Sequence, residues 1–188
     1  MDKKRIFAAC QISEDARKVI NNLSQELKDS RFNLKFTPKD QLHLTLAFLE
    51  RLRVNELAKV FEVAEAACRG FAPFSLFLSN LGAFPNLKLP KVVYVALLGD
   101  TSTLTNLAKK IQKELLNSGF DFNQEFTPHV TIARIKSYVP KTERRRLGET
   151  IQRWGELTPI KTLVNAVYIF ESTPTSAGHV HTLLEKLI

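Results

Sequence analysis

Cysteine is scarce in this 188-residue chain, which has two, and so are methionine and tryptophan, with one each. Cys10 and Cys68 are too few for a disulfide framework, and both stand among apolar residues, so we expect reduced core thiols. The chain also lacks any apolar run near the ~20 residues that a membrane span needs. The first apolar stretch ends at Gln11, which is too short for a signal peptide, so we predict a cytoplasmic protein with no membrane partner.

Several sequence motifs are absent. There is no G-x-G-x-x-G, no Walker-type glycine loop and no H-E-x-x-H, so nothing supports dinucleotide binding, a nucleotide triphosphatase or a zinc peptidase. The four histidines are His43, His129, His179 and His181. No acidic residue shares a strand face with His43 or His129, and zinc sites usually need three or four protein ligands, so we predict no metal. His179 and His181 share a strand face, and their role stays open.

Basic residues exceed acidic ones, 27 to 19, which gives a net charge of +8. An excess of this size suits a partner that carries phosphate, although charge alone does not identify one. Hydrophobic residues make up 44% of the chain and include 13 phenylalanines, enough for a substantial core. We therefore expect one two-lobed domain over residues 1–188.

One short phrase occurs twice. His43-Leu44-Thr45-Leu46 and His129-Val130-Thr131-Ile132 both have the aliphatic character of strands, in which residues i and i+2 share a face. Each phrase therefore presents an imidazole beside a hydroxyl. Two such strands brought together would place two histidines and two hydroxyl donors around one point. That arrangement suits acid–base chemistry on an anion without a metal or a covalent intermediate.

The repeat extends beyond the two phrases. A shift of 86 residues relates His43 to His129, and the same shift places the apolar segment 91–96 over 5–10. Between segment and phrase, each half carries a helical stretch with apolar residues at helical spacing. Each half therefore has the order strand, helix, motif strand, which predicts internal pseudo-symmetry.

Apolar periodicity and turn residues predict the remaining elements. Strands are expected at 5–12, 31–36, 42–49, 74–81, 91–98, 129–135, 162–171 and 179–187, and helices at 14–29, 54–68, 103–117 and 141–154. Strands and helices do not alternate regularly throughout. This pattern favours an α+β fold, with two pseudo-symmetric lobes of mostly antiparallel sheet, outer helices and a central cleft, over a doubly wound parallel sheet.

Three further features depend on strand parity and charge. Arg134 offers a phosphate-binding fork, but it has the opposite parity to His129, so only a bulge, a twist or the strand's end would bring it into the site. Phe48 is either a base-stacking residue or a core residue, and its parity favours the core. The basic cluster of Lys141 and residues 144–146 is either a solvated helix face or a surface for RNA.

The two phrases with their flanks resemble the paired signatures of the two-histidine phosphoesterase superfamily. The similarity is greatest to the RNA 2′,3′-cyclic phosphodiesterase family, historically called 2′-5′ RNA ligases. It rests on HLTLAFLE at 43–50 and FTPHVTIAR at 126–134. Segments 5–9, 81–86, 92–96 and 167–172 also resemble the family, so the likeness covers nearly the whole chain.

This resemblance implies metal-independent hydrolysis of RNA 2′,3′-cyclic phosphate ends to 2′-phosphomonoesters, with no cofactor. His43 and His129 would be the acid and the base, in an order that the sequence leaves open. Thr45, Thr131 and Arg134 would bind the phosphoryl oxygens. The expected partner is an RNA or oligonucleotide with a cyclic phosphate end, and the expected state is a monomer. The same chemistry in reverse would join RNA ends through a 2′-5′ linkage.

Two alternatives stay open at this point. The chain could be a module that binds phosphorylated RNA ends without turning them over. It could also be a related phosphodiesterase that acts on another nucleotide, because a pair of His-x-Thr strands recognises phosphate and says little about the base.

Overall fold

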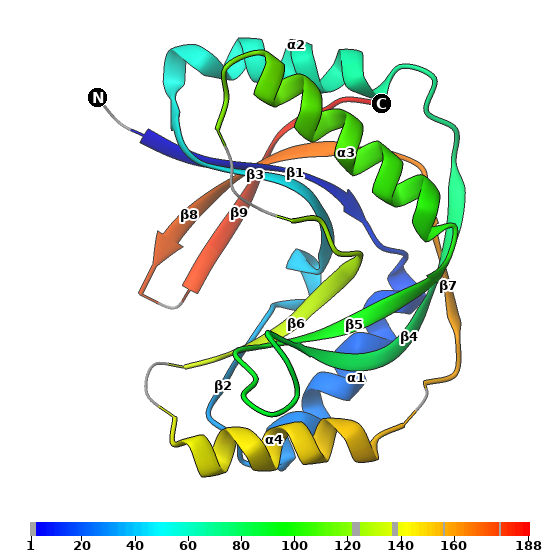
Figure 1. Cartoon of the computed structure of the whole chain (residues 1–188), viewed down its shortest axis with the longest axis vertical. Helices are drawn as coiled ribbons and strands as arrows, with labels where there is room; N and C mark the ends of the chain where they lie inside the picture. The colour runs from blue at the N-terminus through cyan, green and yellow to red at the C-terminus, as the bar shows by residue number, and fades with distance from the viewer. Residues whose placement is uncertain (1–2, 122–124, 137–138, 156, 177) are drawn as a thin grey trace.

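Two antiparallel sheets face each other with helices on their outer sides (Figure 1). The computed structural model describes residues 3–121, 125–136, 139–155, 157–176 and 178–188. The first sheet has the order β3 (His43–Arg53), β1 (Lys3–Gln11), β8 (Tyr168–Thr175), β9 (Gly178–Lys186). The second has the order β2 (Leu34–Phe36), β6 (His129–Ile135), β5 (Val92–Gly99), β4 (Phe74–Phe84), β7 (Ile160–Val164). The predicted α+β class with antiparallel sheets is confirmed.

Four α-helices cover the sheets in the described part of the chain. They are α1 (Glu14–Asp29), α2 (Leu57–Cys68), α3 (Thr101–Asn117) and α4 (Lys141–Arg153). Helix α1 begins where Ser13 caps it, since the Ser13 hydroxyl accepts a hydrogen bond from the Ala16 amide at 3.3 Å. Acidic residues occupy its first turn, where their negative charges interact favourably with the positive end of the helix dipole. Its apolar stripe is buried, so local sequence and packing agree along the whole helix.

Helices α1 and α3 each pack on the sheet that contains the motif strand of the other sequence half. Helix α1, from the first half, contacts β6 and β7 of the second sheet, whereas α3, from the second half, packs on β3 of the first. The Ser13 amide also donates to the Thr162 hydroxyl at 2.7 Å, which joins the start of α1 to β7. Each lobe therefore contains parts of both halves, and the two motif strands belong to one continuous hydrophobic core.

Several predicted boundaries are wrong. The expected strand over 162–171 is two strands, β7 and β8, which lie in different sheets. The expected strand over 74–81 ends too early, because β4 continues to Phe84. The connection between the strands expected over 162–171 and 179–187 is also shorter, since β8 extends to Thr175 and β9 starts at Gly178; Ala177 lies outside the described residues.

Both cysteines are free and buried, as predicted. Burial raises the pKa of the Cys68 thiol to about 11, and it also raises that of Cys10, so neither is a thiolate at neutral pH. Within the described ranges, no helix is both long and apolar enough to cross a membrane.

Candidate active site

The two motif strands carry equivalent β-bulges. Ala8 pairs with Ala47 and Ala9 with Thr45, which leaves Leu46 of β3 as an extra residue. In the second sheet, Val93 pairs with Ala133 and Tyr94 with Thr131, and the extra residue is Ile132. A bulge of this kind shifts the strand by one residue, so side chains beyond it change faces.

Each bulge is supported by a hydrogen bond from outside its own strand pair. The Leu46 carbonyl accepts from Nε2 of Gln112 on α3 at 2.7 Å. The Ile132 carbonyl accepts from the Thr37 amide at 2.9 Å. A bulge leaves backbone groups without ladder partners, and buried backbone groups need partners, so these two bonds stabilise the shifted register.

The bulges decide which residues join the histidines. Beyond Leu46 the burial alternation shifts, so Phe48 is half-buried while Ala47 is buried. The Phe48 ring stacks on Phe7 at 5.9 Å between centroids, and Phe7 lies 4.8 Å from the His43 ring. The prediction that Phe48 packs in the core is therefore wrong. Beyond Ile132, Arg134 changes faces in the same way and lies on the side of His129 and Thr131.

The internal repeat has a slightly different register from the one predicted. The paired strands place Ala8 and Val93 at equivalent positions, because their partners Ala47 and Ala133 are 86 residues apart. The preceding strands are thus related by 85 residues, not 86. With this offset Ala9 is equivalent to Tyr94, whose ring lies 5.6 Å from that of His129. A slip of one residue exchanges the two faces of a strand, so the offset decides which side chains meet the histidines.

Both imidazoles are held in the same tautomer. His43 Nδ1 lies 2.6 Å from the Gln41 carbonyl, and His129 Nδ1 lies 2.7 Å from the Thr127 carbonyl. A carbonyl can only accept, so each Nδ1 carries a proton. In each neutral ring Nε2 is then left as the basic nitrogen. For His43 this Nε2 is 3.0 Å from the Thr45 hydroxyl, the neighbour two residues along the strand.

Aromatic rings fix the orientation of the two imidazoles. His43 contacts Phe7, and its ring also meets that of His181 of β9 edge-on at 5.2 Å. His129 meets the Phe84 ring edge-on at 5.0 Å. Sequence reasoning missed Phe7 and Phe84 as neighbours of the site and left the role of His181 open, because strand register brings these residues to the histidines. His179 is exposed, and its Nδ1 lies 3.3 Å from the Ser172 hydroxyl.

The charges of the two sheets act on one another across the site. The pKa of His43 is lowered to about 4, chiefly by burial and in smaller part by the nearby positive charges of His181, His129 and Arg134. Burial also lowers the pKa of His129, and the charge of Arg134 adds to this. Strands β3 and β6 are in contact, and the charges of His129 and Arg134 act on His43, so these three side chains lie near one another, around the space between the sheets. This space repels cations and favours an anion.

The lowered pKa of His43 predicts an acid-sensitive fold. The unfolded chain takes up a proton on this ring near pH 6.5, whereas the folded chain does so only near pH 4. Stability is therefore fully present above pH 6.5 and is lost as the pH falls toward 4. The free energy of unfolding can be measured in urea at pH 7.5 and pH 4.5. Its decrease between the two pH values should be smaller in His43→Gln than in the wild type, by on the order of 2 kcal/mol. His179→Gln, which changes an exposed ring, should leave the loss nearly intact; an equal effect of both variants would contradict the assignment.

Two facing sheets that each present a His-x-Thr strand to a shared site have the architecture expected of a two-histidine phosphoesterase. A family model described as the 2′-5′ RNA ligase superfamily matches residues 13–174. The chain belongs to this superfamily.

Similar proteins extend over almost the full chain. An RNA 2′,3′-cyclic phosphodiesterase of Thermotoga maritima is 32% identical over 96% of this chain and 92% of its own length. A crystal structure of a Thermus thermophilus protein gives a TM-score of 0.80 at 25% identity, covering 97% of this chain and 96% of that one. Escherichia coli LigT complexed with 3′-AMP gives a TM-score of 0.73 at 20% identity, covering 98% and 97%, and supports the fold alone.

Proposed function

We propose that this protein hydrolyses the 2′,3′-cyclic phosphate ends of RNA to 2′-phosphomonoesters. One observation carries the proposal: two imidazoles on facing sheets share a tautomer that leaves each Nε2 as the basic nitrogen beside an anion-favouring space. The name of the Thermotoga maritima relative supports the same substrate for this chain. LigT, which shares this fold, has been solved in complex with 3′-AMP, a ribonucleotide phosphate.

The chemistry requires one proton acceptor and one proton donor on opposite sides of phosphorus. One Nε2 takes a proton from water as the water oxygen bonds to phosphorus. The other Nε2 gives its proton to the ribose 3′-oxygen as the bond between phosphorus and that oxygen breaks. Both rings are mostly neutral in the free protein, because burial lowers their pKa values. A bound phosphodiester anion favours the imidazolium form, so substrate binding itself promotes protonation of the ring that acts as the acid.

The hydroxyls and the arginine act on the phosphoryl oxygens. Thr45 and Thr131 stand two residues from the histidines on the same strand faces and donate to the non-bridging oxygens. Arg134 supplies a permanent charge to the same group. Because each step is reversible, the same groups support joining of RNA ends through a 2′-5′ linkage when a 5′-hydroxyl replaces water.

Product analysis tests this proposal directly. Incubation with cytidine 2′,3′-cyclic phosphate should yield cytidine 2′-phosphate and no 3′-phosphate, as resolved by ³¹P NMR or ion-exchange chromatography. A 3′-phosphate product would contradict the assigned leaving oxygen. Tight binding of the cyclic nucleotide without turnover would instead support a binding module.

Activity should be independent of divalent metal. In the described ranges, no group of three or more His, Cys, Asp or Glu side chains is arranged to hold a metal ion. Two imidazoles and a guanidinium already supply the proton transfers and the charge that a metal would otherwise provide. We therefore expect the initial rate to stay within twofold after dialysis against excess EDTA. A large loss that added Zn²⁺ or Mn²⁺ restores would contradict this prediction.

A further inference from the structure

Beyond the candidate site, the end of β6 borders a groove whose described charged residues are all basic. Its volume is about 460 Å³, within the size range of ligand sites. It is formed by the residue before β5, the end of β6 and the start of α4. The described lining residues include no acidic side chain: Lys91, Ile135, Lys136, Val139, Pro140, Lys141 and Arg144.

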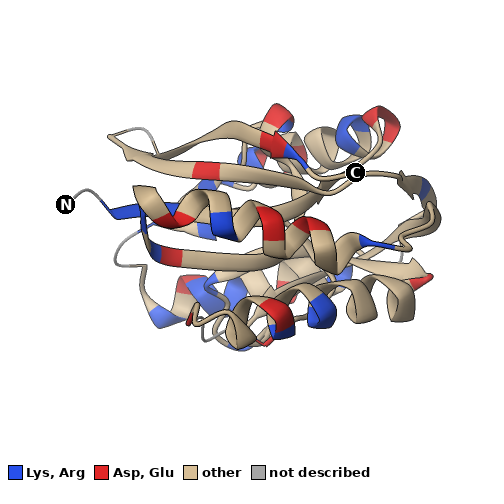
Figure 2. Cartoon of the chain, turned by 90° about the horizontal axis from the view of Figure 1, so that it is seen from above, with Lys and Arg blue, Asp and Glu red and all other residues tan. Residues whose placement is uncertain are grey.

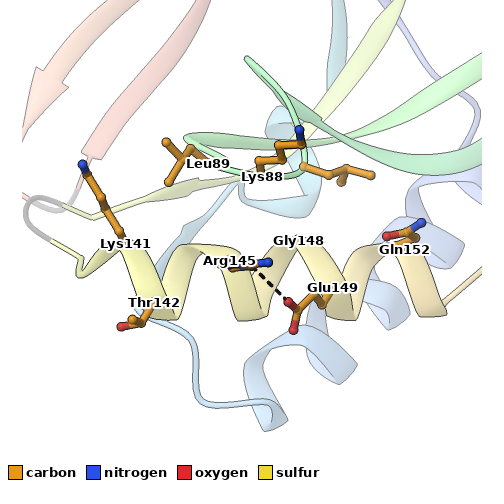
Figure 3. A pocket seen from close by; sticks show the side chains of 9 residues that line it. Lys88, Leu89, Lys141, Thr142, Arg145, Gly148, Glu149 and Gln152 are labelled. Carbon is orange, nitrogen blue, oxygen red and sulfur yellow. Dashed lines mark ion pairs between the residues drawn. The ribbon is translucent and has the colours of Figure 1, made fainter.

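This concentration of charge differs from the rest of the surface. Figure 2 shows basic and acidic residues interspersed over the helices and strands, so the excess positive charge is not spread evenly over the surface. A neighbouring pocket of about 620 Å³ shares Lys141 with the groove, but it also contains an acidic residue. There Arg145 pairs with Glu149 at 3.5 Å, along the dashed line in Figure 3. The pocket therefore has three basic residues against one acidic residue, whereas the groove has four basic residues and, among those described, no acidic one.

The basic residues of the groove are of two kinds: one has a structural role, and three are available to a ligand. Arg144 is half-buried, and its Nε donates to the Pro90 carbonyl at 2.9 Å, which ties α4 to the loop before β5. Lys91, Lys136 and Lys141 are exposed, and within the described part of the chain they form no ion pair. Three ammonium groups are thus available to an anion in a groove whose other lining residues include Ile135, Val139 and Pro140.

Backbone pairing at the end of β6 places one edge of the groove near Arg134. Lys136 follows Arg134 by two residues, and its amide donates to the Asn33 carbonyl at 3.1 Å, which extends the pairing between β2 and β6. A strand rises about 3.3 Å per residue, so Lys136 lies about 7 Å beyond Arg134 along the strand. The Ile135 amide donates to the Lys91 carbonyl at 2.9 Å, which places Lys91 beside this point.

We propose that this basic groove binds the phosphodiester backbone of the RNA strand on the 5′ side of the cyclic phosphate. The inference rests on the proposed function. A 2′,3′-cyclic phosphate occupies the 3′ end of its strand, so every other phosphate lies on the 5′ side and must leave the site in one direction. Lysines bind phosphate as point charges, and apolar side chains give no hydrogen-bond readout of the base. We therefore expect the groove to favour longer RNA strands over shorter ones, regardless of base sequence.

A comparison of short and long substrates tests this inference. The variant Lys136→Gln/Lys141→Gln removes two groove charges, and Lys109→Gln/Lys113→Gln removes two exposed charges from α3. For a decaribonucleotide with a 2′,3′-cyclic phosphate end, the groove variant should lower kcat/KM about tenfold, mainly through KM. The α3 variant should lower it less than twofold. For a 2′,3′-cyclic mononucleotide, both variants should match the wild type.

Salt provides a second measurement. Each phosphate contact on a single strand contributes about 0.7 to the log–log dependence of affinity on salt. The groove variant should therefore reduce the slope of log kcat/KM for the decamer by about 1.4. If the wild type hydrolyses both substrates and the groove variant keeps the wild-type ratio between them, the groove inference is wrong. If the wild type hydrolyses neither substrate, the proposed function itself fails.

Discussion

His129→Ala and His43→Ala each lower kcat/KM for a 2′,3′-cyclic mononucleotide by a factor of about 10² to 10⁴. This is the range expected when a positioned general acid or base is removed. The reason is geometric: each Nδ1 is bound to a carbonyl two residues back, at 2.6 Å for His43 and 2.7 Å for His129, so only Nε2 can exchange a proton with substrate. The measurement is the initial rate over a range of substrate concentrations, made on variants whose circular dichroism matches the wild type.

The double variant distinguishes shared from separate roles. Groups that act in one proton-transfer event are non-additive, so His43→Ala/His129→Ala should lose little more than the worse single variant. His179→Gln serves as the control for histidine content, because its exposed ring lies beside Ser172, and it should keep wild-type kcat/KM. Near-normal turnover in either single alanine variant would contradict the two-histidine mechanism.

The parts of the fold that depend on local sequence could be predicted. Helix α1 has the bounds expected, because Ser13 caps it, acidic residues follow and the apolar spacing is helical throughout. The pairing of His with Thr on one strand face could also be predicted, because alternation holds from His43 to Thr45 and from His129 to Thr131.

The parts that depend on distant partners could not. Strand parity alone places Phe48 in the core and turns Arg134 away from His129. The bulges reverse both conclusions, and their support comes from Gln112 on α3 and from Thr37 before β3. Neither residue has a sequence signal that links it to a particular carbonyl on another element. A bulge of this kind is therefore visible only once the elements are packed.

The prediction of a single strand over 162–171 is wrong for a related reason. Apolar residues continue from Val164 through Ala166 and Val167 into β8, and all three are buried. Periodicity therefore indicates one strand. In the structure, the chain leaves the second sheet after Val164 and enters the first at Tyr168, and Ala166 and Val167 of the connection are buried. The pattern records burial, and it does not record which sheet provides it.

Arg134→Ala should lower kcat/KM by a factor of about 10² to 10³, the cost of removing one donor to charge that develops in a transition state. A cyclic phosphodiester carries one negative charge, and attack by water places further charge on its non-bridging oxygens. The guanidinium therefore interacts more strongly with the transition state than with bound substrate, and the loss should appear in kcat more than in KM. Arg134→Lys keeps the charge but not the two-pronged fork, so an intermediate loss of about tenfold is expected.

The choice of control follows from the fold. Arg153 ends α4, where its side chain bonds only to Glu149 and Thr150 of the same helix among the described residues. Arg153→Ala removes the same charge from the protein without touching β6, and it should leave kcat unchanged. Because the bulge at Ile132 is what turns Arg134 toward the histidines, an unaffected kcat in Arg134→Ala would mean that this change of face has no catalytic consequence. The charge that stabilises the phosphoryl oxygens would then have to come from the imidazoles alone.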